Sequence, residues 1–249
     1  YPVPRDALVP ERVTRSGGDW FVEGQKPQVE RDPPSVAWVD SSVVVPIGHH
    51  GLRFDAAFAY PLLPRYLLGG SFRRSPLFAA EPRHTVTADG TVLTHGGATY
   101  SLRWWSVLDR SLIAAVDGEV ELEPTTDADM DSAFEHHIAS LRASAAESPE
   151  ARRRLRLQDQ ARKLGRAAFW PVLGQVMASP DGRVMVERLD LARVDPESRR
   201  FWDVLGGNQR LEGRMVTPAD GRVVAFIWPC LYLQGRQAIR RLCSQQAAG

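Results

Sequence analysis

The sequence predicts a mainly β fold that is interrupted by one helical hairpin. Short runs of β-branched and aromatic residues, bounded by Asp-Gly and Gly-Gly pairs, occupy residues 35–126 and 169–249. Between them, residues 127–168 carry apolar side chains at helical spacing among many charged residues. Residues 1–34 are rich in proline, glycine and charge, so we expect an extended N-terminal arm with one short strand at 19–22.

The composition argues against two classes of partner. Lys and Arg number 31 and Asp and Glu number 30, a balance that gives no overall field to attract nucleic acid. The longest apolar stretches, such as 43–47 and 223–227, are far shorter than the ~20 residues that a bilayer crossing needs. We therefore expect no membrane span, and nucleic acid is an unlikely partner.

The two cysteines, Cys230 and Cys243, are close to the C-terminus. Their spacing fits neither a zinc knuckle nor a CxxC redox motif. The sequence leaves a disulfide open, and we favour two unpaired thiols.

Strand signals between residues 35 and 126 become clearer along the chain. Runs at 36–39 and 43–45 predict two strands about a turn at 40–42, and prolines and glycines then interrupt the chain. Asp89-Gly90 lies between two β-branched runs, which is a strong hairpin signal because both central residues of such a turn need positive φ. With further turns at Gly96-Gly97 and at 109–111, we expect a four-stranded meander.

Residues 127–168 predict the helical hairpin. Asp127 or Asp129 can cap the first helix. Ser148 and Pro149 suit the N-cap and first position of a second helix, and Gly165 is its expected end. The first helix carries one apolar stripe, made of Met130, Ala133, Phe134, His137, Ile138 and Leu141.

An arginine run at 152–156 is the sharpest charged feature of the chain. It could contact RNA, DNA or anionic lipid. No aromatic stacking platform accompanies it, so we favour a solvated helix face whose arginines pair with Glu147, Glu150 and Asp159.

A degenerate repeat links the two β regions. The run at 88–92 matches the run at 180–184, and Trp105-Ser106-Val107-Leu108 matches Trp202-Asp203-Val204-Leu205. A third similar run opens at 219–223, 39 residues after the second. One four-stranded propeller blade has about 40 residues, so the spacing predicts blades.

This pattern resembles the blades of six-bladed β-propeller proteins of the NHL-like kind, common among uncharacterised bacterial exported proteins. The resemblance covers roughly 76–228 and is carried by Asp181-Gly182-Arg183-Val184-Met185-Val186, by 202–205 with its Gly-rich turn, and by 211–214. It implies a partial β-propeller of four-stranded meander blades at 35–126 and 169–249, with the helical insertion between them. It also implies a periplasmic or extracellular location. Leu205-Gly206 departs from the Phe-Asp that such blades often carry there.

The length predicts an incomplete ring. Six blades of about 40 residues need about 240 residues before any insertion. A 42-residue insertion and a non-repetitive N-terminal third leave room for about three readable blades. Since propellers protect their strand edges by closing, we expect the chain to be part of a longer protein, with diverged blades as the alternative.

No catalytic, cofactor-binding or metal-binding residues can be assigned from the sequence, and no cofactor is expected. Nucleophile-elbow, phosphate-loop and dinucleotide motifs are absent. His84 and His95 flank the Asp89 turn and could face each other, but no further ligand is in view. The remaining histidines lack metal-site spacing: His49, His50, His136 and His137. Four tryptophans at strand positions favour packing over a binding groove: Trp104, Trp105, Trp202 and Trp228.

Three functional hypotheses follow. The first is a non-enzymatic β-propeller that binds an unknown protein or small-molecule ligand through loops on one face. The second is a propeller-type hydrolase or lyase whose polar residues converge on a central channel. The third is a structural β module whose helical hairpin docks a partner.

Overall fold

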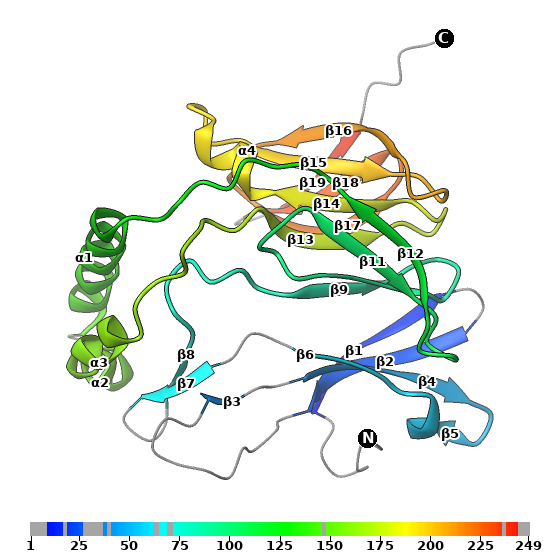
Figure 1. Cartoon of the computed structure of the whole chain (residues 1–249), viewed down its shortest axis with the longest axis horizontal. Helices are drawn as coiled ribbons and strands as arrows, with labels where there is room; N and C mark the ends of the chain where they lie inside the picture. Colours follow the sequence, from blue (N-terminus) through cyan, green and yellow to red (C-terminus); the bar gives the residue numbers. More distant parts are fainter. Residues whose placement is uncertain are drawn as a thin grey trace.

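A computed structural model describes residues 9–16, 19–26, 37–38, 41–61, 65–68, 72–145, 148–235 and 238–243. The protein is mainly β, as predicted, and the named strands pair antiparallel throughout (Figure 1). We number the larger sheets I to IV in chain order. Three helices stand to one side of the sheets.

Sheet I contains the N-terminal strands. It has the order β1 (Val9–Ser16), β2 (Asp19–Lys26), β4 (Ser41–Gly48) and β5 (Gly51–Leu52), and β6 (Phe58–Pro61) also pairs with β4. A 3-10 turn, η2 (Phe54–Ala56), links β5 to β6. The small strands β3 (Ala37–Trp38), β7 (Arg65–Leu68) and β8 (Phe72–Arg74) form a separate sheet.

Two predictions for this region were wrong. Residues 9–26 form a hairpin of two eight-residue strands, in place of the predicted arm with one short strand. The strands at 37–38 and 41–48 do not pair about a turn at 40–42. Instead β3 pairs with β7, and β4 pairs with β2 and β6. Residues 1–8, 27–36, 39 and 40 lie outside the described part.

Sheets II and III are the predicted four-stranded meanders. Sheet II contains β9 (Arg83–Val86), β10 (Val92–His95), β11 (Ser101–Trp105) and β12 (Leu112–Asp117). Sheet III contains β13 (Leu173–Ala178), β14 (Val184–Arg188), β15 (Arg200–Leu205) and β16 (Leu211–Thr217). A short helix, α4 (Leu189–Val194), lies in the connection between β14 and β15.

The Asp-Gly turns of these two sheets have the same geometry. Thr87 N donates to Thr91 O at 2.9 Å, and Ser179 N donates to Arg183 O at 2.7 Å. Of each Asp-Gly pair only the glycine has positive φ, 82° at Gly90 and 91° at Gly182. The expectation of positive φ at both central residues was therefore wrong, while the predicted turns are confirmed.

The strand register shows that sheets II and III are equivalent beyond their turns, but it corrects the sequence alignment of the two repeats. Val92 pairs with Trp105, and Val184 pairs with Leu205, each immediately beyond the Asp-Gly turn. Both sheets also carry an irregularity at the same place between their third and fourth strands. Trp105 therefore corresponds to Leu205, so matching Trp105 with Trp202 was wrong by three residues.

Sheet IV contains β17 (Arg222–Ile227), β18 (Cys230–Gln234) and β19 (Ile239–Cys243). Gly221 leads from sheet III into the first strand of sheet IV, whereas Gly90 and Gly182 join first strands to second strands. The third predicted repeat is thus out of phase with the other two. Cys230 lies opposite Cys243, and they form a disulfide, so the preference for free thiols was wrong.

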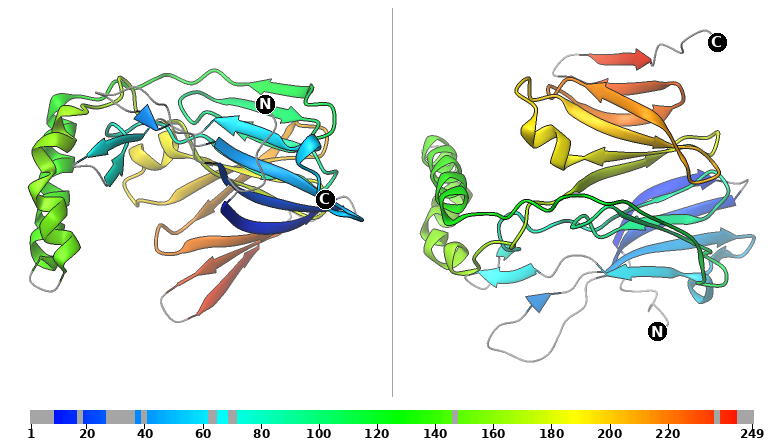
Figure 2. Two further views of the ribbon diagram at one scale, coloured as in Figure 1. Left: turned by 90° about the horizontal axis from the view of Figure 1, so that it is seen from below. Right: turned by 45° about the horizontal axis from the view of Figure 1, so that its top comes forward.

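The four large sheets pack face to face in chain order (Figure 2). Phe21, Val44 and Val92 belong to one core between sheets I and II. A second core between sheets II and III includes Leu93, Trp104 and Val184, and a third between sheets III and IV includes Trp202 and Leu231. The first strand of sheet III lies beside the first strands of sheets II and IV.

The predicted helical hairpin consists of α1 (Asp127–Ser144), α2 (Pro149–Arg156) and α3 (Gln158–Lys163). Thr126, not Asp127 or Asp129, is the first N-cap, and Asp129 completes a capping box with it. Ser148 and Pro149 occupy their predicted positions. Gly165 follows α3 with a φ of 73°.

The hairpin has a small core and is fastened to the sheets. Phe134 and Ala161 are buried together, with Leu77 packed against them. Leu77 N donates to Gly165 O at 3.0 Å, and Thr125 N donates to Ala168 O at 2.9 Å. The first bond joins the end of the hairpin to the segment before β9, and the second joins the start and the end of the hairpin to each other.

Candidate functional site

Polar residues for which the sequence predicts no role lie between the sheets. His84 pairs in register with Thr94, while His95 pairs with Arg83. Residues one position apart on a strand point to opposite faces. His84 therefore faces sheet I and His95 faces sheet III, and the idea that these two histidines face each other was wrong.

A buried cluster joins sheets I and II. His84 Nε2 lies 3.1 Å from Glu23 Oε2, and Ser42 Oγ lies 3.2 Å from His84 Nδ1. Thr14 Oγ1 donates to Glu23 Oε1 at 2.5 Å. By distance alone, a serine contacts a base and the base contacts a carboxylate, which is the arrangement that nucleophilic catalysis uses.

The placement of Ser42 does not suit that chemistry. Its Oγ is almost equally far from both ring nitrogens of His84, at 3.2 and 3.4 Å. An oxygen in the ring plane at those distances would overlap the carbon between the two nitrogens, so Oγ lies over the face of the ring. A hydroxyl there is not aligned with a nitrogen lone pair. We therefore interpret the cluster as a satisfied polar contact between two sheets.

A second cluster joins sheets II and III. Asp203 is 1% exposed and accepts from Arg188 and Arg214, at 2.8 Å in each case. Arg188 lies 5.0 Å from the centre of the Tyr100 ring. Burial, and then the charge of Asp203, raises the pKa of Tyr100 to about 12. This cluster is an internally neutralised contact that fixes the two sheets against each other.

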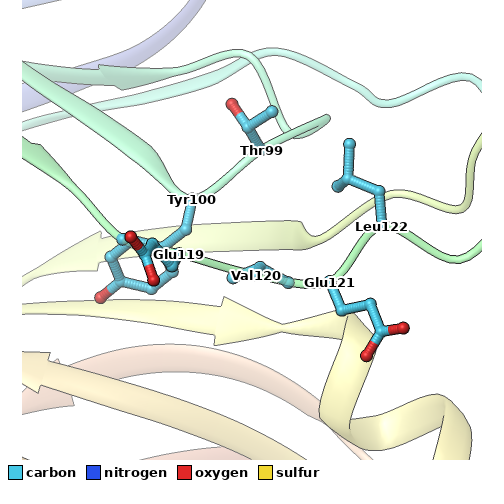
Figure 3. A pocket seen from close by; sticks show the side chains of 7 residues that line it. Thr99, Tyr100, Glu119, Val120, Glu121 and Leu122 are labelled. Atoms are coloured by element: carbon cyan, nitrogen blue, oxygen red, sulfur yellow. The ribbon is translucent and has the colours of Figure 1, made fainter.

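Tyr100 also borders a pocket of about 440 Å³ at this end of the interface (Figure 3). The segment after β12 supplies most of its lining, from Gly118 to Leu122. Glu121 points away from Tyr100 in Figure 3. None of its lining residues has a buried polar atom that lacks a partner. The pocket therefore shows no preference for a particular kind of ligand.

His95 differs from the other polar residues between the sheets. It is 2% exposed, and neither ring nitrogen forms a hydrogen bond with any residue in the described ranges. Burial lowers its pKa to about 4, and the approach of the Gly174 backbone opposes that shift without completing a hydrogen bond. His95 is therefore a neutral imidazole at pH 7.

The opposite end of the same interface carries a pocket shared by the twin turns. Its volume is about 390 Å³. Sheet II contributes its Asp-Gly turn and an indole, and sheet III contributes its Asp-Gly turn and the turn after β15. The lining residues are Thr87, Ala88, Asp89, Trp104, Pro180, Asp181, Gly182, Gly206, Gly207 and Gln209. We call this the twin-turn pocket.

Both aspartates of the twin-turn pocket are ionised at neutral pH. Burial would raise the pKa of Asp89, but hydrogen bonds from Thr87 and Thr91 outweigh it and lower the pKa. Burial has the same opposing effect at Asp181, where bonds from Ser179 and Arg183 lower the pKa. The pocket therefore has an acidic rim.

Trp104 forms an indole wall of the twin-turn pocket. It is only 4% exposed. Trp105 Nε1 donates to Thr94 Oγ1 at 3.0 Å, and Trp202 Nε1 donates to Thr217 Oγ1 at 3.1 Å. Trp104 Nε1 has no such acceptor among the residues that the structure describes. Trp104 Nε1 is also not one of the enclosed polar atoms that lack a partner, so this donor is open to solvent or to a ligand.

The arginines of the helical hairpin are mostly committed to internal contacts. Arg154 pairs with Glu150 at 2.6 Å, as predicted, and Arg162 pairs with Asp131. Arg152 donates to Ala145 O at 2.7 Å. The predicted partner Glu147 lies outside the described residues.

Within the described ranges, no three His, Cys, Asp or Glu side chains gather as a metal ion would require. The helices over the same ranges are too short or too polar for a bilayer crossing.

The parts of the twin-turn pocket can be found in the sequence, but the pocket itself cannot. The packing role predicted for Trp104 and Trp202 is confirmed by their burial. The two Asp-Gly turns were found as repeat markers. The repeat could have predicted that the two turns lie close together, because equivalent turns of neighbouring sheets lie at the same edge of a stack.

Comparison with protein-family models, with curated proteins and with solved structures finds no match to this chain.

Proposed function

We propose that this chain is a non-enzymatic, propeller-like binding module that holds a small ligand in the twin-turn pocket. The observation that carries the proposal is the pocket's construction. Two sheets with equivalent register bring the same turn to one edge, and a buried indole with an unused N–H closes the space between them. Concave sites with a few convergent polar groups are typical of ligand binding.

The propeller-like arrangement is part of the proposal. Its support is the sequential packing of sheets I to IV and the position of β13 between β9 and β17. In a propeller, successive four-stranded blades pack around a central channel. Further blades would complete the ring.

An exported location is proposed on separate grounds. The Cys230–Cys243 disulfide ties β18 to β19. Disulfides persist mainly in oxidising compartments such as the periplasm and the cell exterior. Peptide mapping of non-reduced protein from its native cell tests this, because a free-thiol form would remove the support.

The propeller-type hydrolase is less well supported. Glu23, Ser42 and His84 are the residues that such an enzyme would use, and Ser42 lies over the ring face of His84. Turnover of ester, amide or glycoside substrates that is lost in a Ser42→Ala variant would overturn the non-enzymatic proposal.

The ligand proposal is tested with the full chain labelled with 5-fluorotryptophan. A Trp104→Phe variant assigns the Trp104 fluorine resonance. A chemically diverse fragment library is then added, and we expect a subset of fragments to shift the Trp104 resonance more than that of the fully buried Trp202. If no fragment shifts Trp104 selectively, the binding function is wrong.

The helical hairpin is a second candidate for partner contact. Its own core around Phe134 and its backbone bonds to Leu77 hold it in a fixed position beside the sheets. If residues 127–164 are replaced by a short linker and the remainder still folds, the hairpin is an inserted module available for docking. If the remainder does not fold, its role is structural.

A further inference from the structure

The twin-turn pocket restricts the chemistry of its ligand, and this inference rests on the proposed binding function. Three features of the pocket act together. They are an acidic rim, an indole donor and exposed turn backbone.

The rim excludes anions. Asp89 and Asp181 both line the pocket. Thr87 and Thr91 bond to Oδ1 of Asp89, at 2.5 Å from Thr87 Oγ1 and 3.1 Å from Thr91 N, so Oδ2 is the oxygen left for a ligand. Arg183 compensates the charge of Asp181 at 2.5 Å, and it also pairs with Glu212 at 2.6 Å. A carboxylate or phosphate would enter against net negative charge.

The indole N–H favours a ligand that carries a hydrogen-bond acceptor. Trp104 Nε1 carries a hydrogen that only an acceptor can satisfy. A metal ion or a quaternary ammonium group has no lone pair to offer. Such a ligand would leave this donor unused, whereas a ligand with an oxygen atom can accept from it.

A neutral hydroxylated ligand meets both demands. Each hydroxyl group donates one hydrogen bond and accepts others. One hydroxyl can donate to Asp89 Oδ2 while a neighbouring oxygen accepts from Trp104 Nε1. A Cβ at Gly182 or at Gly207 would meet nothing within 4 Å, so ring atoms can approach the backbone at these two turns.

We propose that the twin-turn pocket binds a neutral sugar unit, with the Asp89 carboxylate accepting from its hydroxyls and Trp104 Nε1–H donating to one of its oxygens. The volume of about 390 Å³ is within the range of small-molecule sites. No covalent step is involved.

The experiment titrates the full 5-fluorotryptophan-labelled chain with neutral monosaccharides and disaccharides. The named probes are glucose, galactose, mannose, xylose, N-acetylglucosamine and maltose, with tetramethylammonium, calcium and inorganic phosphate as charged probes. We expect at least one sugar to shift the Trp104 resonance saturably at millimolar concentration or below, and the charged probes to leave it in place.

Variants tie the binding to the named groups. Trp104→Phe removes the N–H and Asp89→Asn removes the carboxylate charge, and each should weaken sugar affinity about tenfold or more. Trp105→Phe and Asp220→Asn are the matched controls. Trp105 donates inside the protein, and Asp220 belongs to the third Asp-Gly turn, outside this pocket. Isothermal titration measures the affinity of Trp104→Phe, and melting curves establish that each variant is folded.

The outcomes separate this inference from the proposed function. Fragments that shift Trp104 while every sugar fails would overturn the sugar assignment and keep the binding site. A response to the charged probes alone would also overturn the sugar assignment. Sugar binding that is unchanged in both Trp104→Phe and Asp89→Asn would place the sugar elsewhere and overturn it too. If nothing shifts Trp104, both proposals are wrong.

Discussion

Sheets II and III have the same strand register, but the buried polar residue at one equivalent position is hydrogen-bonded in sheet III and, within the described ranges, not in sheet II. His95 pairs with Leu102 in sheet II, and Glu187 pairs with Trp202 in sheet III, at the same distance from the Asp-Gly turn. Glu187 accepts from Gln175 N at 3.0 Å and from Arg200 Nε at 2.7 Å, whereas His95 has no partner in the described structure. The turns and the register therefore fix the sheet, but each interface satisfies its polar groups independently.

The third strands show the same contrast. Arg103 and Asp203 occupy equivalent positions. Arg103 reaches the exposed Asp117, while Asp203 is enclosed between two arginines. Sheet III thus depends on buried charge and sheet II does not, and substitutions at equivalent positions should have unequal effects.

The largest difference is expected at this pair of positions. Asp203→Ala leaves Arg188 partly uncompensated in the interior, and we expect a loss of about 3–5 kcal/mol in the free energy of unfolding. Arg103→Ala breaks an exposed pair and should cost less than about 1 kcal/mol. Urea denaturation measures both. Equal losses would show that the two sheets are stabilised alike.

The disulfide should matter only for sheet IV. This sheet has three strands over the described residues where sheets II and III have four, and the Cys230–Cys243 bond joins its last two strands. Cys230→Ser with Cys243→Ser should lower stability by about 3 kcal/mol, the value expected for a closed loop of about 15 residues.

Reduction provides the control for the disulfide. Dithiothreitol should lower the midpoint of urea unfolding for the natural chain and leave the double variant unchanged. Unaltered stability of the reduced natural chain would mean that the strand pairing of sheet IV needs no covalent tie.

The unpartnered His95 should make sheet II sensitive to acid. The unfolded chain takes up a proton near pH 6.5, while the folded His95 stays neutral down to about pH 4. The unfolded state therefore binds more protons in this window, and stability falls as pH falls, by about 1.4 kcal/mol per unit from this group.

His95→Leu tests that acid sensitivity. It should flatten the dependence of the free energy of unfolding between pH 6.5 and pH 4. At pH 7 its stability should be equal or higher, because an unsatisfied polar group is replaced by an apolar one. The exposed His136→Ala should keep the natural slope, and an unchanged slope in His95→Leu would show that His95 has an acceptor.

The smallest effects should be equal in the two sheets. Gly90→Ala and Gly182→Ala force a side chain into positive φ, which costs about 1–2 kcal/mol. Neither new Cβ clashes, since the nearest atom is 3.7 Å away at Gly90 and none is within 4 Å at Gly182. Thermal unfolding should show similar losses for both.

Gly213→Ala is the matched control for the turn glycines. Gly213 lies in β16, and a Cβ there would meet nothing within 4 Å. Its φ is not positive, so the substitution should be neutral or slightly stabilising. A large difference between Gly90→Ala and Gly182→Ala would break the equivalence of the two turns.

The sequence was most informative where a local rule determines structure. The Asp89-Gly90 turn, the Ser148-Pro149 helix start and the stop at Gly165 each follow from the backbone preferences of a few residues. It was least informative for pairing at a distance. Nothing local states that β3 pairs with β7, or that residues 9–26 form two strands of sheet I.

The out-of-phase third repeat shows the same limit. An Asp-Gly pair fixes a bend but not which strands it joins, so Asp220-Gly221 was read as equivalent to Asp89-Gly90. The twin-turn pocket likewise needed the packing of sheet II on sheet III. Only that packing reveals that Trp104 lines a pocket with its N–H unused.

The stacking of the sheets is tested most directly by the two adjacent tryptophans of β11. Trp104 belongs to the core shared with sheet III, and the Trp105 ring lies 6.0 Å from the Phe58 ring of sheet I. We expect nuclear Overhauser effects from the Trp104 ring to Val184 or Leu205 methyl groups, and from Trp105 to Phe58. Contacts from Trp104 to sheet I, or from Trp105 to sheet III, would contradict the stack.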